Sequence, residues 1–161
     1  MRPLPHIAPA DASDAAAFIQ LRGQTRENAV PAARLASLGI TAESWARDVR
    51  RGTLIGYTAK SPEQLLGYCF GDTQTGEVVV VALLPEAEGL GLGRELLERV
   101  VAKLRSAGHQ RLFLGCSSDP KVRSYGFYRH LGWQPTGAMD SNNDEVLELV
   151  FGPSGCTPSV A

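Results

Sequence analysis

The sequence predicts a mixed α/β fold in a single domain, and three observations support that prediction. A chain of 161 residues has the length of one ordinary domain, and 43% hydrophobic with 20% charged residues is a composition able to bury a core. Apolar residues recur with a helical period in some segments and a strand period in others. A valine-rich strand over 77–84 also runs through a glycine-rich loop into an amphipathic helix over 93–107. We expect one domain over residues 1–151, followed by a disordered tail over 152–161 that is rich in Gly, Pro and Ser.

Local signals mark the elements before residue 77. Ser13 or Asp14 can cap a first helix, because their side-chain oxygens accept bonds from the free N–H groups of a first turn. Thr41 can cap a second helix, and Gly52 suits its left-handed C-terminus. The predicted elements are, in order, a strand opening at Ile7, helices over 15–26 and 42–51, and strands over 54–59 and 65–71 separated by the turn 61–63.

The second half continues the alternation of strands and helices. The β-branched run over 77–84 predicts a strand buried on both faces. Gly108 ends the helix over 93–107, and the polar segment 140–144 predicts a hairpin loop. The remaining elements are a strand over 111–116 as a parallel partner of 77–84, a helix over 120–131, and closing strands over 134–139 and 146–151.

The glycine-rich loop carries the first functional signal. Gly89, Gly91 and Gly93 alternate at a helix N-terminus, where unpaired N–H groups and the helix dipole favour phosphate oxygens. Whether the dinucleotide fingerprint G-x-G-x-x-G is read from Gly89 or from Gly91, its last position does not fall on a glycine. Arg94 stands where a P-loop needs Lys, so nucleoside triphosphate binding is disfavoured. A structural turn between strand and helix stays open as the alternative.

Two segments resemble motifs of the GCN5-related N-acetyltransferase (GNAT) family. Residues 88–93, Glu-Gly-Leu-Gly-Leu-Gly, resemble its acetyl-CoA pyrophosphate loop, R/Q-x-x-G-x-G/A, with Glu88 in the place of Arg or Gln. Backbone amides can hold a pyrophosphate whatever side chain precedes them. Residues 125–133 resemble its late signature, a helix ending F/L-Y-x-K-x-G-F. The family often has Asn and Ala where this chain has Lys121 and Ser124.

The resemblance covers residues 54–151 best and implies both a fold and an activity. It implies a mostly antiparallel central sheet, splayed at the cofactor site and flanked by about four helices. It also implies an N-acetyltransferase that moves an acetyl group from acetyl-CoA, without a metal, to a primary amine of a small metabolite or amino-acid-like acceptor. The transfer would be direct attack in a ternary complex. The alternatives are a non-catalytic acyl-CoA-binding or regulatory module, and an acetyltransferase acting on a protein amine.

The resemblance also implies roles for single residues. Tyr128 corresponds to the tyrosine that protonates the departing thiolate. A positioned phenol, with an unperturbed pKa of about 10, can donate a proton to a thiolate whose thiol has a pKa of about 8.5. Glu77 corresponds to the glutamate base, although a solvated residue ending a hairpin is equally open. The N–H of Leu83, after a bulge, would polarise the acetyl carbonyl. The implied cofactor-binding set is Leu83, Gly89, Leu90, Gly91, Leu92, Gly93, Arg94 and Tyr128.

The acceptor side is predicted from the fold class. It would be lined by the first two helices, by the loop between them over 22–39 and by nearby strand faces; the candidate residues are Arg22, Arg26, Glu27, Asn28 and Tyr68. Glu27 with Glu77 could attract a cationic amine, whereas the arginines could clamp a substrate carboxylate. Solvated helix charges are the alternative for these residues.

Composition disfavours several other classes. A net charge of -1 offers no field for nucleic acid, and the absence of a run of about twenty apolar residues argues against a membrane segment. Cys69, Cys116 and Cys156 are an odd number without a close pair, which disfavours both a disulfide framework and a zinc site. We therefore expect a cytoplasmic protein with a small-molecule amine acceptor and no nucleic-acid or membrane partner, and a homodimer is left open.

Overall fold

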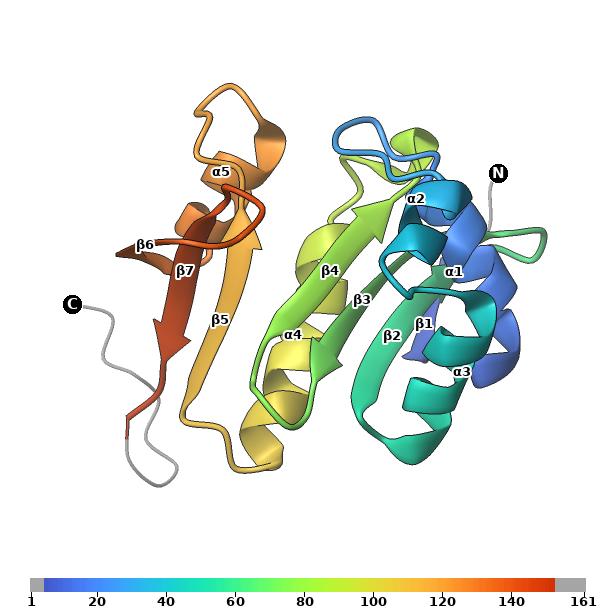
Figure 1. The fold of residues 1–161 in the computed structure, drawn as a ribbon, viewed down its shortest axis with the longest axis horizontal. Coiled ribbons are helices and arrows are strands. Elements are labelled where there is room, and N and C mark those ends of the chain that lie inside the picture. The colour runs from blue at the N-terminus through green and yellow to red at the C-terminus, as the bar shows by residue number, and fades with distance from the viewer. Residues whose placement is uncertain (1–4, 153–161) are drawn as a thin grey trace. The chain divides into compact units, whose positions relative to one another are not determined.

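The computed structural model describes residues 5–152, and its internal contacts divide the chain into two compact units (Figure 1). The first unit is Met1–Leu104 and the second is Arg105–Ala161. Each has its own antiparallel sheet with at least one helix, so the mixed α/β prediction is confirmed. One domain over 1–151 stays a prediction. Residues 153–161 of the predicted tail, with Cys156, lie outside the described residues.

The first unit is built on a four-stranded antiparallel sheet. Its strands are β1 His6–Pro9, β2 Leu54–Lys60, β3 Leu65–Asp72 and β4 Val78–Leu83, and they lie in that order across the sheet. The β2–β3 hairpin turns where the sequence predicts it, because Ser61 Oγ accepts bonds from the N–H groups of Glu63 and Gln64 at 3.3 and 3.2 Å. Because β4 is the last strand in this order, it is an edge strand of this sheet.

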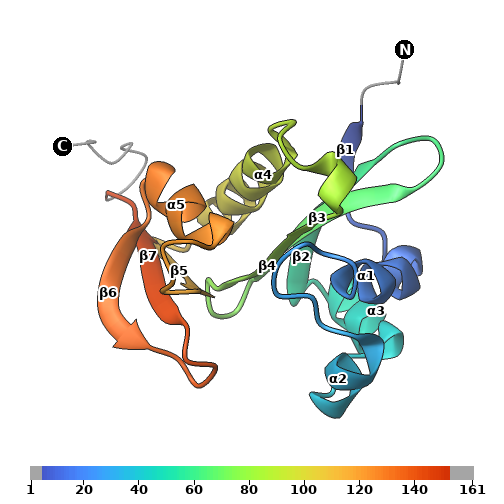
Figure 2. The ribbon, with the colours of Figure 1, turned by 90° about the horizontal axis from the view of Figure 1, so that it is seen from above.

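Helices cover both faces of this sheet (Figure 2). Helices α1 Ala15–Arg22, α2 Ala32–Ser37 and α3 Ala42–Arg51 lie on one side, and α4 Leu92–Ser106 lies on the other. The short 3₁₀ helices η1 Ala12–Asp14 and η2 Pro85–Ala87 precede α1 and α4. Five α-helices are thus described where about four were expected.

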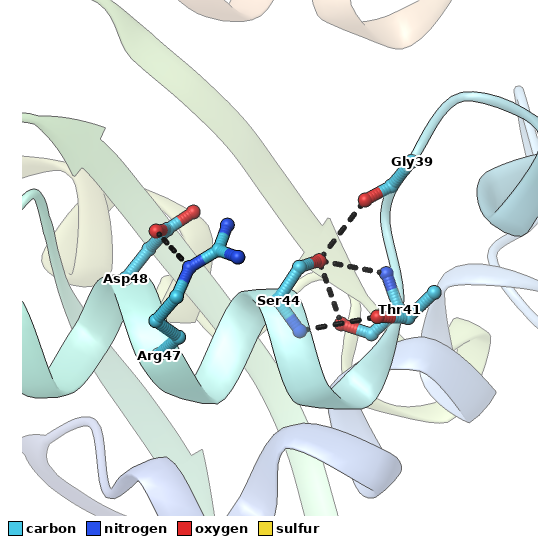
Figure 3. Close-up of polar contacts among 5 residues, drawn as sticks. All are labelled: Gly39, Thr41, Ser44, Arg47 and Asp48. Atoms are coloured by element: carbon cyan, nitrogen blue, oxygen red, sulfur yellow. Dashed lines mark hydrogen bonds and ion pairs between the residues drawn. The ribbon is translucent and has the colours of Figure 1, made fainter.

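The ends of α3 agree with the predicted caps. Thr41 Oγ1 accepts from Ser44 N–H at 3.1 Å, and Ser44 Oγ accepts from Thr41 N–H at 2.9 Å (Figure 3). This reciprocal pair satisfies two N–H groups of the first turn, and such a cap is typically worth about 1 kcal/mol. Gly52 takes the left-handed conformation, with φ 76°, at the other end.

An aromatic cluster fills the space between β3 and the helices. Phe18 from α1, Trp45 from α3, and Tyr68 and Phe70 from β3 have ring centroids 5.1 to 5.5 Å apart in every pairing. Tyr68 and Phe70 share a face because strand side chains alternate with a period of two. Gly71 lies on the opposite face, where an added Cβ would fall 2.8 Å from a Leu104 carbon. A glycine there lets α4 pack closely on β3.

The second unit has a three-stranded sheet and one helix. Its elements are β5 Arg111–Cys116, α5 Arg123–His130, β6 Gln134–Met139 and β7 Glu145–Val150, and the strand order is β5-β7-β6. The predicted parallel partnership of 111–116 with 77–84 stays a prediction. β5 pairs with β7 in antiparallel fashion, because β7 returns between β5 and β6.

Several predicted boundaries in the first unit are corrected. Helix α1 ends at Arg22 rather than at residue 26, because Gly23 and Gln24 turn the chain with N–H bonds to the last helical carbonyls. Helix α2 lies in a segment predicted as a loop. Asp11, not Ser13 or Asp14, caps the turn before α1, since its carboxylate accepts from Ser13 N–H at 2.9 Å. The Asp14 carboxylate binds Lys60 Nζ instead.

The valine-rich strand is less buried than predicted. Val78 and Ala82 are buried, but residue Val79 is 48% exposed, so β4 is not covered on both faces. Within residues 5–152, the helices are all too short or too polar to cross a membrane.

Candidate functional site

The outer edge of β4 presents backbone donors. Leu84 N–H donates to Leu66 O of the neighbouring strand at 2.9 Å. Because the direction of N–H groups alternates along an antiparallel strand, the N–H groups of Leu83 and Val81 point away from β3. Leu83 therefore has the orientation that its predicted role requires, and Val81 shares that orientation.

β4 also carries a bulge before Leu83. The ladder with β3 shifts between Phe70, which pairs with Val80, and Gly71, which pairs with Val78. Val79 is thus the extra residue, four positions before Leu83. A bulge therefore precedes Leu83 in β4, and the orientation of the Leu83 N–H follows from the regular ladder between the bulge and Leu83.

Two glycines of the loop after β4 adopt backbone conformations that other residues avoid. Gly89 has φ 79° and Gly91 has φ 77°, both in the left-handed region. A Cβ built on either glycine meets nothing within 4 Å, so both face open space. Leu90 between them is 63% exposed. The loop is therefore shaped by backbone geometry and leaves room for a ligand against the main chain.

Helix α4 begins directly after this loop. Its first described backbone bond runs from Glu95 N–H to Gly91 O at 3.1 Å. The N–H groups of Leu92, Gly93 and Arg94 therefore belong to the first turn, which has no acceptor within the helix. The dipole of a helix of 15 residues adds partial positive charge at this end. The arrangement suits an anionic group.

The residue before the loop forms an ion pair with a distant segment. Arg26 Nε donates to both carboxylate oxygens of Glu88, at 3.2 and 3.0 Å. The Glu88 side chain is 15% exposed and the Arg26 side chain 59%. Arg26, predicted to face the acceptor, thus lies beside the glycine loop. The sequence contains no signal for this pair, because the two residues are 62 positions apart.

The segment that carries Arg26 is held by its own hydrogen bonds. Arg22 Nη1 donates to Asn28 O at 2.6 Å, and Val30 N–H donates to Arg22 O at 2.9 Å. Thr25 Oγ1 donates to Glu27 O at 3.0 Å, and Asn28 has φ 55°. Of the predicted acceptor residues, Arg22 therefore supports the backbone of this segment, and Glu27 and Asn28 lie within it.

Tyr68 does not fit its predicted place on the acceptor side. Its side chain is fully buried in the aromatic cluster, and its hydroxyl donates to Phe18 O at 2.9 Å. Burial raises the pKa of this hydroxyl, so it stays protonated. Tyr68 is a core residue with a satisfied hydroxyl, because the rings of α1 and α3 cover it.

Glu77 lies at the opposite end of β4 from the loop. Its carbonyl accepts from Asp72 N–H at 2.8 Å in the β3–β4 hairpin. Six residue steps of strand separate it from Leu83, or about 20 Å at the usual rise per residue. A carboxylate at Glu77 is therefore too far for direct proton transfer from an amine held at the N–H of Leu83. The proton could instead pass through a chain of water molecules. The distance would be shorter if the N–H of Val81, rather than that of Leu83, held the acetyl carbonyl.

The second unit holds the predicted acid, Tyr128, on α5. Tyr128 is buried, and its ring lies 5.0 Å from that of Phe127 and 6.1 Å from that of Trp133. Its carbonyl accepts the N–H groups of Leu131 and Trp133, each at 3.1 Å, and Gly132 between them has φ 98°. This left-handed glycine turns the chain from α5 toward β6, as predicted. Tyr128 is thus held by packing on a well-defined helix end.

Cys116, at the end of β5, belongs to the core of the second unit. It is buried, and burial raises the pKa of its thiol. A thiol that stays protonated is a poor nucleophile. Within residues 5–152, no group of three or more His, Cys, Asp or Glu side chains is arranged to hold a metal ion.

Comparison with known proteins decides the family. Residues 16–133 match the model of the acetyltransferase (GNAT) family. The chain belongs to the acetyltransferase (GNAT) family. The matched range includes the β4 edge, the glycine loop and Tyr128, so both resemblances noted in the sequence fall within it.

Two acetyltransferases resemble part of this chain. A mycothiol acetyltransferase of Beutenbergia cavernae is 38% identical over 64 residues, which are 40% of this chain and 21% of the relative. Serotonin N-acetyltransferase 2 of Oryza sativa subsp. japonica is 45% identical over 71 residues, which are 44% of this chain and 30% of that enzyme. The chain thus spans less than a third of the length of either relative.

A solved N-acetyltransferase structure extends the likeness of the fold to most of the chain. The PaiA N-acetyltransferase of Thermoplasma acidophilum, in complex with coenzyme A, has a TM-score of 0.75 with 16% identity. The match covers 91% of this chain and 99% of the PaiA chain. Together with the two antiparallel sheets, this likeness confirms the GNAT fold class expected from the sequence.

Proposed function

We propose that this GNAT protein is an acetyl-CoA-dependent N-acetyltransferase whose acceptor is a primary amine of a small metabolite or amino-acid-like molecule. The observation that carries the proposal is a series of main-chain donors in the first unit. It comprises the outward N–H groups of Val81 and Leu83, the open loop at Gly89 and Gly91, and the first turn of α4. Family membership makes an acetyl thioester the natural ligand for such a series.

The residues present fit acetyl-CoA in chemistry and in space. A pyrophosphate needs several N–H donors and no intruding side chain, and the loop offers both at its left-handed glycines. The amide-bearing arm of CoA suits the free edge of β4, since an edge strand offers unpaired N–H and C=O groups. The proposed cofactor-binding residues are Leu83, Gly89, Leu90, Gly91, Leu92, Gly93, Arg94 and Tyr128.

Three groups of this chain would carry the chemistry. Bound acetyl-CoA supplies the acetyl thioester that a neutral amine attacks. The N–H of Leu83 stabilises negative charge that develops on the carbonyl oxygen. Glu77 removes the ammonium proton through water, as the length of β4 requires. Tyr128 donates its phenolic proton to the thiolate as the C–S bond breaks, and the second proton lost by the attacking nitrogen returns to Tyr128 through solvent.

The acceptor would meet the segment between α1 and α2. In that segment, Arg22 Nη1 binds Asn28 O, and Arg26 lies at Glu88 beside the glycine loop, so we propose neither as a clamp for a substrate carboxylate. Glu27 and Asn28 remain as proposed acceptor contacts, and a carboxylate suits a cationic amine. Relatives named for serotonin and for mycothiol support a small-molecule acceptor rather than a protein.

Calorimetric titration with acetyl-CoA, using NADH and ATP as controls, tests the cofactor. We expect saturable binding of acetyl-CoA alone. Thiol release in the presence of arylalkylamines, amino acids and a peptide with a free N-terminus then tests the acceptor. Binding without turnover on any amine would favour a silent acyl-CoA-binding module, turnover on the peptide alone would favour a protein acceptor, and no binding would overturn the proposal.

A further inference from the structure

The ion pair between Arg26 and Glu88 stands at the entrance of the glycine loop. Glu88 directly precedes Gly89, and its N–H bonds to Pro85 O at 3.2 Å at the end of η2. This bond ties the backbone of Glu88 to the end of η2. A carboxylate alone at that place would repel a pyrophosphate bound by the loop.

Arg26 changes the charge of that entrance. Only its Nε takes part in hydrogen bonds within residues 5–152, and both bonds go to Glu88. The pair is formally neutral, and Nη1 and Nη2 remain as donors on a side chain that is 59% exposed. A guanidinium offers donors in a planar fork that matches phosphate oxygens. A single arginine can thus hold a carboxylate through one edge and a phosphate through another.

The segment carrying Arg26 keeps it in that position. The bonds from Arg22 Nη1 to Asn28 O and from Val30 N–H to Arg22 O close this segment onto the end of α1. Arg26 lies inside the closed segment, so its approach to Glu88 does not depend on a free loop. This pre-organisation lowers the entropy lost when a ligand binds.

We propose that Arg26 supplies the cationic side chain of the pyrophosphate site, with Glu88 as the group that positions it. The resembled family motif places Arg or Gln on the loop itself at the position of Glu88, so this chain would deliver the same chemistry from the segment between α1 and α2. The inference rests on the proposed function, because it needs acetyl-CoA at the glycine loop. It assigns Arg26 to the cofactor rather than to the acceptor.

Calorimetric titration with CoA of the wild-type chain and of Arg26→Ala tests this assignment. Loss of a charge-assisted contact should raise the Kd about tenfold or more. Arg47→Ala is the matched control, since Arg47 Nε also binds a neighbouring carboxylate, Asp48, at 3.3 Å and its side chain is 53% exposed (Figure 3). The control should keep the wild-type Kd. Equal affinity of Arg26→Ala and wild type, or an equal loss in both variants, would overturn the inference.

Two double variants separate a phosphate contact from mere neutralisation of Glu88. If Arg26 only cancels the carboxylate, then Arg26→Ala with Glu88→Gln should bind CoA like wild type, which would overturn the inference. If Arg26 contacts the phosphate, that variant should stay about as weak as Arg26→Ala. Arg26→Ala with Glu88→Arg should regain affinity, because the cation returns to the loop; failure to regain it in a folded variant would count against the assignment.

The failure of this inference is distinguishable from the failure of the proposed function. A wild-type chain that does not bind CoA would remove the proposed cofactor, and Arg26 with it. A wild-type chain that binds CoA while Arg26→Ala binds equally well would leave the acetyltransferase proposal intact. Thermal unfolding of each variant shows whether the compared chains are folded.

Discussion

The two units contribute to the proposed chemistry in different ways. In the first unit, the loop after β4 offers main-chain N–H groups beside open space at Gly89 and Gly91. In the second, α5 offers one side chain, Tyr128, packed against the rings of Phe127 and Trp133. Most substitutions leave main-chain N–H donors in place. Such donors become unavailable only when a new side chain occupies the space in which the ligand would bind. A side-chain donor is lost when one atom is removed.

The largest effect should follow from removing that one atom. Tyr128→Phe keeps the ring contacts with Phe127 and Trp133 but removes the proposed proton donor. We expect kcat to fall about 10- to 10⁴-fold while the Kd for acetyl-CoA changes little. Steady-state kinetics with calorimetry measures both.

Tyr125→Phe is the matched control for this substitution. Tyr125 lies on the same helix, and its ring, 3.6 Å from the guanidinium carbon of Arg129, is retained in phenylalanine. The control should keep the wild-type kcat. If Tyr128→Phe also keeps the wild-type kcat, Tyr128 is not the proton donor. The first unit's role in binding would then be the only part of the comparison left.

A smaller effect should follow from filling the open space of the loop. Gly91→Val places a branched side chain where the proposed pyrophosphate lies, and we expect the Kd for acetyl-CoA to rise about 10- to 100-fold. Calorimetry on the folded variant measures this change.

Gly52→Val matches the backbone strain of that variant. Gly52 has φ 76° against 77° at Gly91, and a Cβ there also meets nothing within 4 Å. It should lose similar stability, of about 1 to 2 kcal/mol, while its Kd stays that of wild type. Equal binding by Gly91→Val and Gly52→Val would place the cofactor elsewhere.

The proposed base should have a weaker effect than the acid. Glu77 lies about 20 Å along β4 from Leu83, so it can act only through water or on a carbonyl held nearer. Glu77→Gln should lower kcat about 3- to 30-fold and move the acidic limb of the pH–rate profile, as loss of a relayed base would. An unchanged pH–rate profile would exclude Glu77 as the base and favour the alternative, a solvated residue that ends a hairpin. Glu63→Gln, in the β2–β3 turn, is the control.

The smallest effect concerns a carboxyl of the second unit that the proposed chemistry does not use. Burial, and secondarily the charge of Asp140, raise the pKa of Asp144. A raised pKa in the folded state means that Asp144 destabilises the protein once it ionises, so stability is lost as pH rises through that pKa. Asp144→Asn should therefore stabilise at pH 7, by less than about 1 kcal/mol, and not at pH 3. Thermal unfolding at the two pH values measures it, and equal shifts at both would contradict this account.

Elements with local signals could be predicted from the sequence. Helix α3 begins at the Thr41 cap and ends at Gly52 because both ends are satisfied by residues adjacent in sequence. The glycine loop was predicted for the same reason, since left-handed backbone favours glycine. Helix α2 was missed because its N-cap is Pro31, which offers no side-chain acceptor, and because only six residues form it.

The predicted acceptor side depended on contacts that no local pattern encodes. Tyr68 has an amphipathic side chain that suits either a pocket or a core, and the rings of Phe18 and Trp45 decide for the core. Arg26 carries a charge that suits either a substrate or a salt bridge, and Glu88 decides for the salt bridge. Neither outcome could be predicted, because the deciding partner lies far away in the chain.

The sequence by itself determined the family, the glycine loop, the ends of α3 and the turn at Gly132, because short-range hydrogen bonding and backbone sterics act between neighbouring residues. Only the tertiary structure decided the pairing of β5 with β7, the place of the bulge in β4, the burial of Tyr68 and the partner of Arg26. These depend on which distant segments meet when apolar faces are buried together. Such meetings minimise the exposed surface of the whole chain rather than of any one segment.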